Sequence, residues 1–521
     1  MPPRAIVIGA GVGGCATALL LAEAGLEVTL LEKNPRIGGS CSAYEKDGFS
    51  VDIGTHLFCR GDKGPLGEVL RRVGAPGAIP FRRTRDLAEL RSVGGDGRLA
   101  RVAVPAAVHR LPRFAWDMAR LLDLGPREAL AVARLFAHIL AMSEAEVAAW
   151  DHETVDTFLH RFGDHERVVG IFGFLLGLFF VLPYWRVSAG EALWCFRRLV
   201  RDHALSYPLG GSIRVPGTYA DLARERGALV RTRAGVGRIL VEGGAVRGVV
   251  TTTGEELLAE VVVSTSSVRT TVLHLAGRQH FPERYVRRAE TLVGSAIAVQ
   301  AKIGLDRPLV EAGALVGGVG ERHDPLRLPV SEMAAMYGAV EAGRLPEVVP
   351  FYCPVPTNFD PSLAPEGGQL LTACALAPTT DVPLADPAPA WEEAMLRTLR
   401  QVIPGLDEHI QFVDRFSVRF IEHWIGKEYG PAISTAQTPD QVGARRPRVH
   451  TPVRGLYLAG CGAGGRGVGT ELAASSALEC ADRILADLDR RQVARVPAPP
   501  LPVRLARHAA RTPLAWATRL P

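Results

Sequence analysis

The chain has 521 residues, of which 47% are hydrophobic and 22% charged, and this predicts a globular protein of two or three domains. Its formal net charge of +5 belongs to the C-terminal end, because residues 490–521 contain seven arginines and no carboxylate; the rest of the chain has no basic stripe for a nucleic-acid backbone, which excludes that partner. The eight cysteines form no C-x-x-C pair and no histidine cluster has zinc-ligand spacing, so we expect a reduced, metal-free chain.

The first segment, from Arg4 to Glu32, predicts a strand, a glycine turn, a helix and a second strand. Gly9, Gly11 and Gly14 match G-x-G-x-x-G, and Glu32 lies 18 positions beyond Gly14. A tight turn needs Gly9, backbone approach to a pyrophosphate needs Gly11, and packing of helix on strand needs Gly14. The helix N-terminus then presents unpaired N–H groups to the phosphates, and the acid meets a ribose diol.

The next part of the chain predicts a second nucleotide-side loop followed by helices. Gly38 and Gly39 form a second glycine turn, and residues 48–54 alternate as a short strand does. From 105 to about 202, apolar positions recur every three or four residues, which predicts a helical insertion. Residues 168–185 carry no charge over 18 positions, the lower limit of a membrane span. Glycines and a proline there favour a buried or tunnel-lining helix over membrane contact, and either over a true span.

The middle of the chain predicts a return to the first domain and then a separate one. A helix-like stretch at 218–228 is followed by alternating strands, which predict a small antiparallel layer feeding back into a parallel sheet. Residues 291–416 begin with a strand, contain loops rich in Pro and Gly, and include a helix from Trp391 to Val402. We expect this span to form a substrate domain.

Near the C-terminal end, residues 455–488 predict a further strand, glycine loop and helix. The loop contains GAGGRG, from Gly462 to Gly467, which formally matches G-x-G-x-x-G. No acid-terminated strand follows, because Asp482 and Asp487 fall within the predicted helix, so a second dinucleotide would lack its ribose partner. A loop closing over one extended cofactor, with its ADP end at the first turn and its flavin end at the second helix N-terminus, explains the motif better.

Four stretches, in this order, resemble the flavin-dependent phytoene desaturase and carotenoid isomerase family, which is related to the flavin amine oxidases. They are GAGVGGCATALLLAEAGLEVTLLEKNPRIGGS, FSVDIGTHLF, PLGGSIRVPGTYADLARERGA and GLYLAGCGAGGRGVGTELAASSAL, and they cover about half the chain. The resemblance implies an α/β fold of the glutathione-reductase-like (Rossmann) type, FAD bound without a nicotinamide domain, and hydrophobic polyene substrates.

On this basis we expect a discontinuous FAD-binding domain, a mixed-sheet substrate domain, a helical insertion and a basic tail. The expected ranges are 1–100, 205–290 and 417–490 for the FAD-binding domain, 101–204 for the helical insertion, 291–416 for the substrate-binding domain and 491–521 for the tail. The tail places Arg and Trp on a short apolar frame interrupted by Pro513. A disordered tail and a membrane-surface anchor are both open.

The resemblance also implies positions for the cofactor. Glu32 would bind the adenosine ribose, and Val236 the adenine through its backbone. Gly38 to Ser40 would lie at the pyrophosphate and ribityl side, and Gly467 to Thr470 against the isoalloxazine. The full set of expected cofactor-binding residues is Gly9, Gly11, Gly13, Gly14, Glu32, Lys33, Gly38, Gly39, Ser40, Thr55, His56, Val236, Gly460, Cys461, Gly467, Val468, Gly469 and Thr470.

Two positions depart from the family's pattern. Cys461 stands where the family usually has an Asp after the LYLAG strand, which holds the ribityl or pyrophosphate region of the cofactor. Because a thiol is a weak hydrogen-bond partner, we expect backbone N–H groups or water to replace that contact. Glu471 places a carboxylate near the flavin, where many relatives have an apolar or proline-containing turn. It is either catalytic or a favourable charge in the first turn of a helix.

The candidate catalytic residues are His56, Glu471 and Arg466. His56, next to the flavin by resemblance, either shuttles a proton or hydrogen-bonds the flavin edge. Arg466 either neutralises a reduced flavin or a substrate acid, or is a solvated loop residue. With a polyene substrate the protein mainly orients substrate and cofactor while a hydride leaves carbon for the flavin.

The sequence therefore predicts an FAD-dependent oxidoreductase of a hydrophobic polyene or isoprenoid, acting as a carotenoid-type desaturase, saturase or isomerase. Two alternatives stay open: a flavin amine oxidase of secondary metabolism, and a non-catalytic flavin-binding protein, for which Cys461 is the only hint. We expect a cytoplasmic protein with a hydrophobic small-molecule substrate and no nucleic-acid partner, and peripheral membrane contact as a further alternative.

Overall fold

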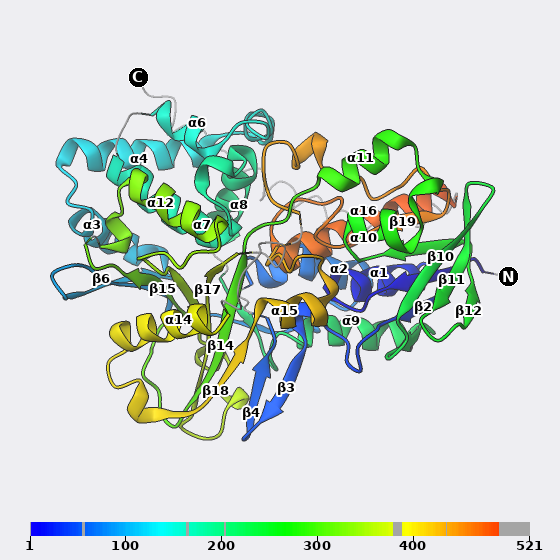
Figure 1. The fold of residues 1–521 in the computed structure, drawn as a ribbon, viewed down its shortest axis with the longest axis horizontal. Coiled ribbons are helices and arrows are strands. Elements are labelled where there is room, and N and C mark those ends of the chain that lie inside the picture. The colour runs from blue at the N-terminus through cyan, green and yellow to red at the C-terminus, as the bar shows by residue number, and fades with distance from the viewer. Residues whose placement is uncertain are drawn as a thin grey trace, which may run out of the picture.

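The computed structural model describes residues 2–54, 58–162, 166–202, 205–322, 324–378, 388–433 and 435–488. Two of the expected site residues, Thr55 and His56, and the expected tail at 491–521 lie outside these ranges. Two sheets lie side by side along the long axis of the molecule, and a layer of helices covers the one at the left of Figure 1.

The first sheet has five parallel strands in the order β19-β13-β1-β2-β9. Its strands are short apolar runs because helices bury both faces of a parallel sheet. The helices include α1, in which every residue from Val12 to Ala22 is buried, and this arrangement confirms the predicted Rossmann-type fold. The elements are β1 (Arg4–Ile8), β2 (Glu27–Leu31), β9 (Leu229–Arg231), β13 (Val261–Ser264), β19 (Leu456–Leu458), α1 (Val12–Glu23), α9 (Arg214–Glu225) and α16 (Gly469–Asp487).

Smaller elements surround this sheet. A three-stranded antiparallel layer, β10-β11-β12, lies in the chain between two parallel strands, which confirms the predicted layer feeding back into the parallel sheet. These elements are β3 (Ala43–Lys46), β4 (Phe49–Asp52), β5 (Phe81–Arg82), β8 (Tyr207–Pro208), β10 (Val236–Glu242), β11 (Ala245–Thr251), β12 (Glu256–Leu258), α2 (Pro65–Arg72), α10 (Val268–Thr270) and α11 (Glu283–Thr291).

The second sheet has seven strands in the order β18-β14-β17-β16-β15-β6-β7. It is mixed, because β15 pairs with β6 in parallel while the other neighbours are antiparallel. Helix α14 covers one face, and the apolar core on the other face is shared with the helical layer. The elements are β6 (Asp86–Val93), β7 (Leu99–Pro105), β14 (Ile297–Leu305), β15 (Ala314–Val319), β16 (Phe351–Pro354), β17 (Gln369–Ala377), β18 (Ile410–Phe416), α12 (Val330–Glu341), α13 (Pro356–Phe359), α14 (Ala388–Val402) and α15 (Val418–Ile421).

The hairpin of β6 and β7 belongs to the second sheet, although we expected most of it in the FAD-binding domain. We expected residues up to 100 in the FAD-binding domain, but residues 315–319 of β15 pair with residues 89–93 of β6. The hairpin is therefore the edge of the second sheet. Local pattern identifies such a strand but does not reveal its partner, which is more than 200 residues away.

The helical layer follows the hairpin. It consists of α3 (Leu111–Leu121), α4 (Pro126–Ala141), α5 (Glu144–Ala148), α6 (Val155–His160), α7 (Glu166–Phe180) and α8 (Ala189–Asp202). A Cβ at Gly173 would lie 2.7 Å from the Tyr184 ring, and one at Gly177 would lie 2.1 Å from the Tyr337 hydroxyl, so glycines let α7 pack closely against its neighbours. Within the described ranges, no helix has both the length and the apolar content needed to cross a membrane.

Candidate functional site

The first glycine loop leaves open space in front of the N-terminus of α1. The Gly9 N–H donates to Leu31 O and the Gly38 N–H to Ala10 O, each at 2.7 Å, so the two glycine turns lie together. A Cβ at Gly14 would lie 1.8 Å from Gly9 O, whereas one at Gly11 would meet no atom nearer than Gly38 O at 4.0 Å. Gly14 is thus required by the protein's own packing, and the space beside Gly11 is free for a ligand.

Glu32 is fixed beside this space. Its side chain is buried, and its two carboxylate oxygens accept hydrogen bonds from the backbone N–H groups of Ala10, at 2.8 Å, and Asn34, at 2.9 Å. The Ala234 N–H donates to Glu32 O at 2.8 Å, two residues before Val236 at the start of β10. The structure therefore brings Glu32 and Val236 to the same end of the parallel sheet.

Lys33 is engaged by another part of the chain. Its Nζ donates to His423 O at 2.5 Å, and Asn34 Nδ2 donates to Trp424 O at 2.8 Å. Burial lowers the pKa of Lys33, against the raising effect of Glu32. These bonds tie the segment after α15 to the end of β2, and the expected contact of Lys33 with the cofactor stays a prediction.

The second glycine loop, between β19 and α16, lies against the first. A Cβ at Gly13 would be 3.0 Å from the Cα of Gly460. Cys461 Sγ donates to Gly469 O at 3.1 Å, closing the loop on itself. Gly467 and Gly469 have φ of 117° and 59°, which favour glycine. Neither α1 nor α16 has a side-chain cap, so both begin with unpaired N–H groups suited to an anionic or carbonyl-bearing ligand.

Arg466 is held by two carboxylates of the helical layer. It lies 2.5 Å from Asp151 Oδ1 and 3.1 Å from Glu191 Oε2. Glu191 is fully buried, and its Oε1 accepts from the Gly467 N–H at 2.8 Å and lies 3.3 Å from Arg446. Arg446 also donates to Gln437 at 2.6 Å. The charge of Arg466 is thereby balanced, which favours a structural role over the expected neutralisation of a flavin or substrate.

Glu471 is the third residue of α16 and is 6% exposed. Burial raises its pKa to about 7, and the charge and backbone N–H of Arg60 partly oppose this. Its Oε1 has no hydrogen-bond partner among the described residues. Helix dipole and first-turn position explain a carboxylate at this place, but the unpaired oxygen leaves it able to exchange a proton near neutral pH.

Sequence reasoning missed a buried lysine that hydrogen-bonds to Gly54. Lys302 on β14 is fully buried, and its Nζ donates to Gly54 O at 2.9 Å and Gln300 Oε1 at 3.0 Å. Burial lowers its pKa, and the charge of Asp52 opposes this. The signal was present, because Gln300 and Lys302 occupy alternate positions in an otherwise apolar strand and therefore share one face.

Asp52 forms the other half of this buried pair. Its carboxylate accepts from the Tyr207 hydroxyl and, at 3.1 Å, from the Ser212 N–H. Burial raises its pKa, and Ser212 and Lys302 oppose the shift. Asp52 ends β4 and Lys302 belongs to the second sheet, so these opposite charges lie where the two regions meet, beside Gly54.

Comparison with known proteins identifies the family and the fold. The family model of flavin containing amine oxidoreductases matches residues 12–485. The chain belongs to this flavin-containing amine oxidoreductase family. It is 26% identical to a zeta-carotene-forming phytoene desaturase of Myxococcus xanthus, with 88% of this chain and 89% of the relative covered. It is 28% identical to a phytoene dehydrogenase of Streptomyces griseus, covering 92% and 94%, and 23% identical to a prolycopene isomerase of Daucus carota, covering 94% and 81%.

Solved structures share the fold of this flavin-containing family member. An oxidoreductase from Methanosarcina mazei superposes with a TM-score of 0.68 at 20% identity, over 91% of this chain and 99% of the other. A putrescine oxidase bound to putrescine gives 0.59 at 17% identity, over 94% and 100%. These similarities establish the architecture of two sheets and a helical layer.

The geometry fits FAD. The open space at Gly11, the buried acid Glu32 and the two uncapped helix N-termini provide for the ADP and flavin ends of one extended molecule. Together with the family, this makes the protein an FAD-dependent oxidoreductase.

Proposed function

We propose that the protein is an FAD-dependent oxidoreductase of hydrophobic polyenes of the carotenoid type, acting as a desaturase, a saturase or an isomerase. The support from relatives is broad, because the phytoene desaturase, phytoene dehydrogenase and prolycopene isomerase each align over at least 81% of their own length. When bound, FAD would accept or return the hydride, and the residues of this chain would hold and orient the two reactants.

One observation carries the substrate class. Val468, which caps the N-terminus of α16, packs in the same apolar cluster as α7 and α8. The partly buried members of that cluster include Phe172, Leu176, Phe179 and Trp194. Apolar side chains therefore reach from α7 and α8 to the N-terminus of α16, an environment that suits an apolar chain better than an ammonium substrate, which would lose hydration there.

We assign the cofactor contacts in three groups. Each rests on the position of the residue at one of the glycine turns, at the end of β2 or at the start of β10. The ADP end takes Gly9, Gly11, Gly13, Gly14, Glu32, Lys33 and Val236; the pyrophosphate and ribityl side takes Gly38, Gly39, Ser40, Gly460 and Cys461; the isoalloxazine takes Gly467, Val468, Gly469 and Thr470. Thr55 and His56 stay predictions, since they lie outside the described residues.

We assign proton handling to Glu471. A pKa of about 7 leaves this carboxyl partly protonated near neutral pH, and its unpaired Oε1 can hold or release the proton that accompanies hydride loss from carbon. Lys302 is a positioning residue in this scheme, because it holds Gly54 O, in the residue directly before Thr55 and His56 in the sequence.

The test is an anaerobic reaction of the purified yellow protein with colourless carotenoid precursors in detergent micelles. We expect the flavin absorbance to bleach as a more conjugated polyene forms. Loss of the polyene's colour together with return of the flavin absorbance, seen only after chemical reduction of the flavin, would indicate a saturase. A change of polyene geometry by reduced enzyme without net oxidation or reduction of the polyene would indicate an isomerase.

The control is the Gly11→Val variant without flavin, which measures conversion that does not depend on the cofactor. A panel of primary and secondary amines is run beside the polyenes. Flavin bleaching by an amine with none by any polyene would overturn the substrate class, and flavin bleached by neither would favour a binding protein.

We also propose a cytoplasmic enzyme that meets a membrane peripherally. All eight cysteines are free thiols, as in a reducing compartment. A carotenoid-type substrate dissolves in lipid, so the enzyme must take it from a bilayer surface.

A further inference from the structure

Helix α3 presents an unusual face to solvent. Trp116 is 62% exposed and Leu111 is 43% exposed. At 100° per residue, Leu111 and Trp116 lie 140° apart around the helix, and the exposed Ala115 and Pro112 fall between them. Phe114 and Met118 instead pack inward on the helical layer. The outer face of α3 is therefore apolar, although its inner face already supplies the contacts that hold the helix.

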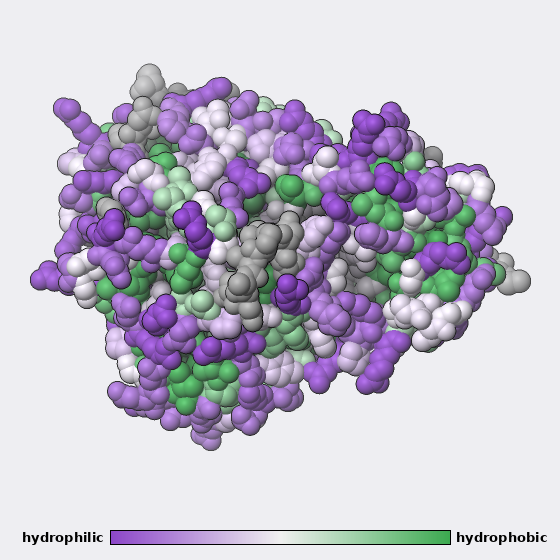
Figure 2. Space-filling model, in the orientation of Figure 1, coloured by the Kyte–Doolittle hydropathy of each residue, from purple (hydrophilic) through white to green (hydrophobic). Residues whose placement is uncertain are grey.

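Helix α4 extends this surface. Leu130 is 51% exposed, and Ala133 and Ala137 are exposed on the same helix. The general surface is different: the face in Figure 2 is mostly hydrophilic, with hydrophobic residues in small separate patches. Large exposed apolar side chains gathered on two neighbouring helices indicate an interaction surface.

Arginines flank the apolar residues. Arg113 and Arg120 on α3 and Arg127 and Arg134 on α4 are exposed. Arg113 pairs with Asp117 at 2.9 Å, but no described carboxylate lies within ion-pair distance of the other three. Glu128 is used within its own helix, since it accepts from the Gly125 N–H at 2.8 Å. The surface is thus both apolar and net positive.

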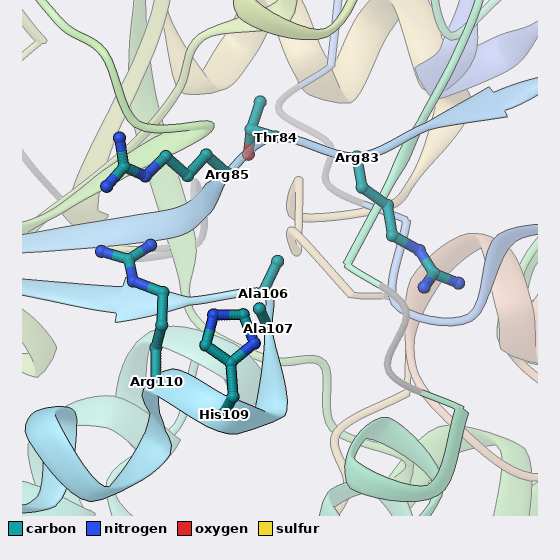
Figure 3. Close-up of a pocket in the computed structure, with 7 residues that line it drawn as sticks. All are labelled: Arg83, Thr84, Arg85, Ala106, Ala107, His109 and Arg110. Atoms are coloured by element: carbon teal, nitrogen blue, oxygen red, sulfur yellow. The ribbon is translucent and has the colours of Figure 1, made fainter.

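A basic hollow adjoins the start of α3. It has a volume of ≈ 440 Å³ and is lined by Arg83, Thr84, Arg85, Ala106, Ala107, His109 and Arg110. Figure 3 shows the guanidinium groups of Arg85 and Arg110 on the same side, the His109 ring beside Ala107, and Arg83 on the other side. The Ala106 N–H donates to Arg85 O at 3.2 Å, which joins the two walls.

The hollow retains positive charge after internal pairing. Arg110 pairs with Asp86 at 2.5 Å, whereas neither Arg83 nor Arg85 pairs with a carboxylate among the described residues. Arg110 is also the residue directly before Leu111 in α3. The anion-attracting hollow and the apolar helix face are therefore contiguous.

We propose that α3, α4 and this hollow form the docking surface for an anionic lipid bilayer, with lipid phosphate in the hollow and Trp116 and Leu111 in the interface. The inference rests on the proposed polyene function for its biological use, but its geometry is independent. Apolar side chains flanked by arginine are the pattern of interfacial helices, and arginines near an anionic leaflet add electrostatic attraction. The contact is distinct from both segments for which the sequence suggested membrane contact, α7 and the tail.

The surface also suits the delivery of an apolar substrate. The inner sides of α3 and α4 belong to the same apolar cluster as α7, α8 and Val468. A polyene leaving the bilayer at α3 and α4 would be next to that cluster. Docking here would thus place the apolar side of the enzyme toward the source of its substrate.

Sedimentation of the full-length protein with vesicles tests the proposal. Vesicles of phosphatidylcholine containing phosphatidylglycerol are compared with pure phosphatidylcholine, at low and high salt. We expect salt-sensitive binding to the anionic vesicles. Trp116→Ser, and separately Arg83→Glu with Arg85→Glu, should each reduce binding at least tenfold, because they remove the interfacial anchor or reverse the charge that attracts phosphate.

Matched controls lie on β11 and β12, at the other end of the view in Figure 1 from α3. Leu258→Ser removes a residue that is 50% exposed, and Arg247→Glu reverses an arginine whose side chain is 63% exposed. Both should bind vesicles as the wild type does. Equal losses in test and control variants, or undiminished binding of the test variants, would overturn the proposal.

Two further arms separate lipid from free anion and docking from catalysis. Saturable binding of inorganic phosphate by a protein that ignores anionic vesicles would overturn the lipid assignment. Flavin content and turnover in detergent micelles should be unchanged in the docking variants, while turnover of substrate embedded in vesicles falls. If the wild-type protein does not bind anionic vesicles, the docking proposal is wrong and the proposed function is untouched. If it does not turn over polyenes in detergent, the proposed function is wrong and the docking proposal is untouched.

Discussion

The two glycine loops of the site are held by different means. The loop at Gly9 to Gly14 is fixed by backbone hydrogen bonds and close packing, chiefly with residues up to Gly38 and with Thr265, whose Oγ1 donates to Gly9 O at 3.3 Å. The loop at Gly460 to Gly469 depends on Glu191 and, through Arg466, on Asp151. The second loop thus receives its support from the helical layer, almost 300 residues away.

Because of this difference, we expect the two loops to respond differently to substitutions. The first loop is held mostly by its own βαβ unit and by Thr265, directly after β13, so a change at the open Gly11 acts on the ligand. The second is a junction between the cofactor site and the apolar helical layer, so changes in that layer act on the flavin end. Four predictions test this contrast, from the largest expected effect to the smallest.

Gly11→Val should abolish FAD binding. The backbone of Gly11 has φ of −76°, which valine adopts readily, and a Cβ there meets no protein atom within 4 Å except Gly38 O at 4.0 Å. We therefore expect a folded apoprotein without absorbance near 450 nm, as measured on the purified variant. Gly338→Val on α12, where a Cβ is also free of contacts, serves as control; a fully yellow Gly11→Val protein would refute the assignment of the turn.

Glu191→Gln should lower the free energy of unfolding by about 3–5 kcal/mol, because it leaves buried arginine charge with too few carboxylates. Urea denaturation followed by circular dichroism measures the loss, and flavin release should accompany it. The control is Glu144→Gln, which removes a carboxylate that pairs with arginines of α8 and whose side chain is 52% exposed. That control should cost at most about 1 kcal/mol, and a similar cost for both changes would contradict the structural role of the buried cluster.

Glu471→Gln should change stability with pH. The pKa of Glu471 is about 7 in the folded protein against an ordinary value of 4.5, so the folded state binds the proton more tightly. The wild type therefore loses this contribution as pH rises from 4.5 to 7, and the variant should gain up to about 3 kcal/mol relative to it. Denaturation at pH 5 and pH 8 measures the gap, for which Arg60 and Asp202 are the charged neighbours.

Turnover gives a second reading of the same variant. Glu471→Gln with full FAD and unchanged polyene turnover would remove the carboxylate from the reaction. A pH-independent stability difference would show that Glu471 is not buried as a proton-holding group.

Cys461→Ala should have the smallest effect. It removes the 3.1 Å contact from Sγ to Gly469 O, a single weak hydrogen bond worth about 1 kcal/mol. Cys461→Ser keeps a hydrogen-bond donor, so its stability should lie between that of the wild type and that of the alanine variant. A larger loss of FAD from the alanine variant than from the serine variant would indicate that this donor shapes the flavin end of the site.

The sequence predicted the parts of the fold that depend on neighbouring residues. The spacing of Gly9, Gly11, Gly14 and Glu32 indicated the parallel sheet, and the helix predicted from Trp391 to Val402 is α14. These signals are local, because a turn or a helix is specified by residues within one or two turns of chain.

The parts that escaped prediction depend on contacts across the chain. Arg466 was considered for a flavin or a substrate, yet its partners on α8 and at Asp151 are invisible in the loop sequence. Lys33 followed the acid at the end of β2 but donates to His423 O. Lys302 was overlooked because its partner Gly54 is 248 residues away.

The parallel sheet gathers its strands from residues 4 to 458. During synthesis β1, α1 and β2 emerge long before β19 and α16, which carry the second glycine loop. The two loops can therefore come together only after the whole stretch between β2 and β19 has been made. A premature stop before β19 would leave the first glycine loop intact in sequence and still yield a chain without the second.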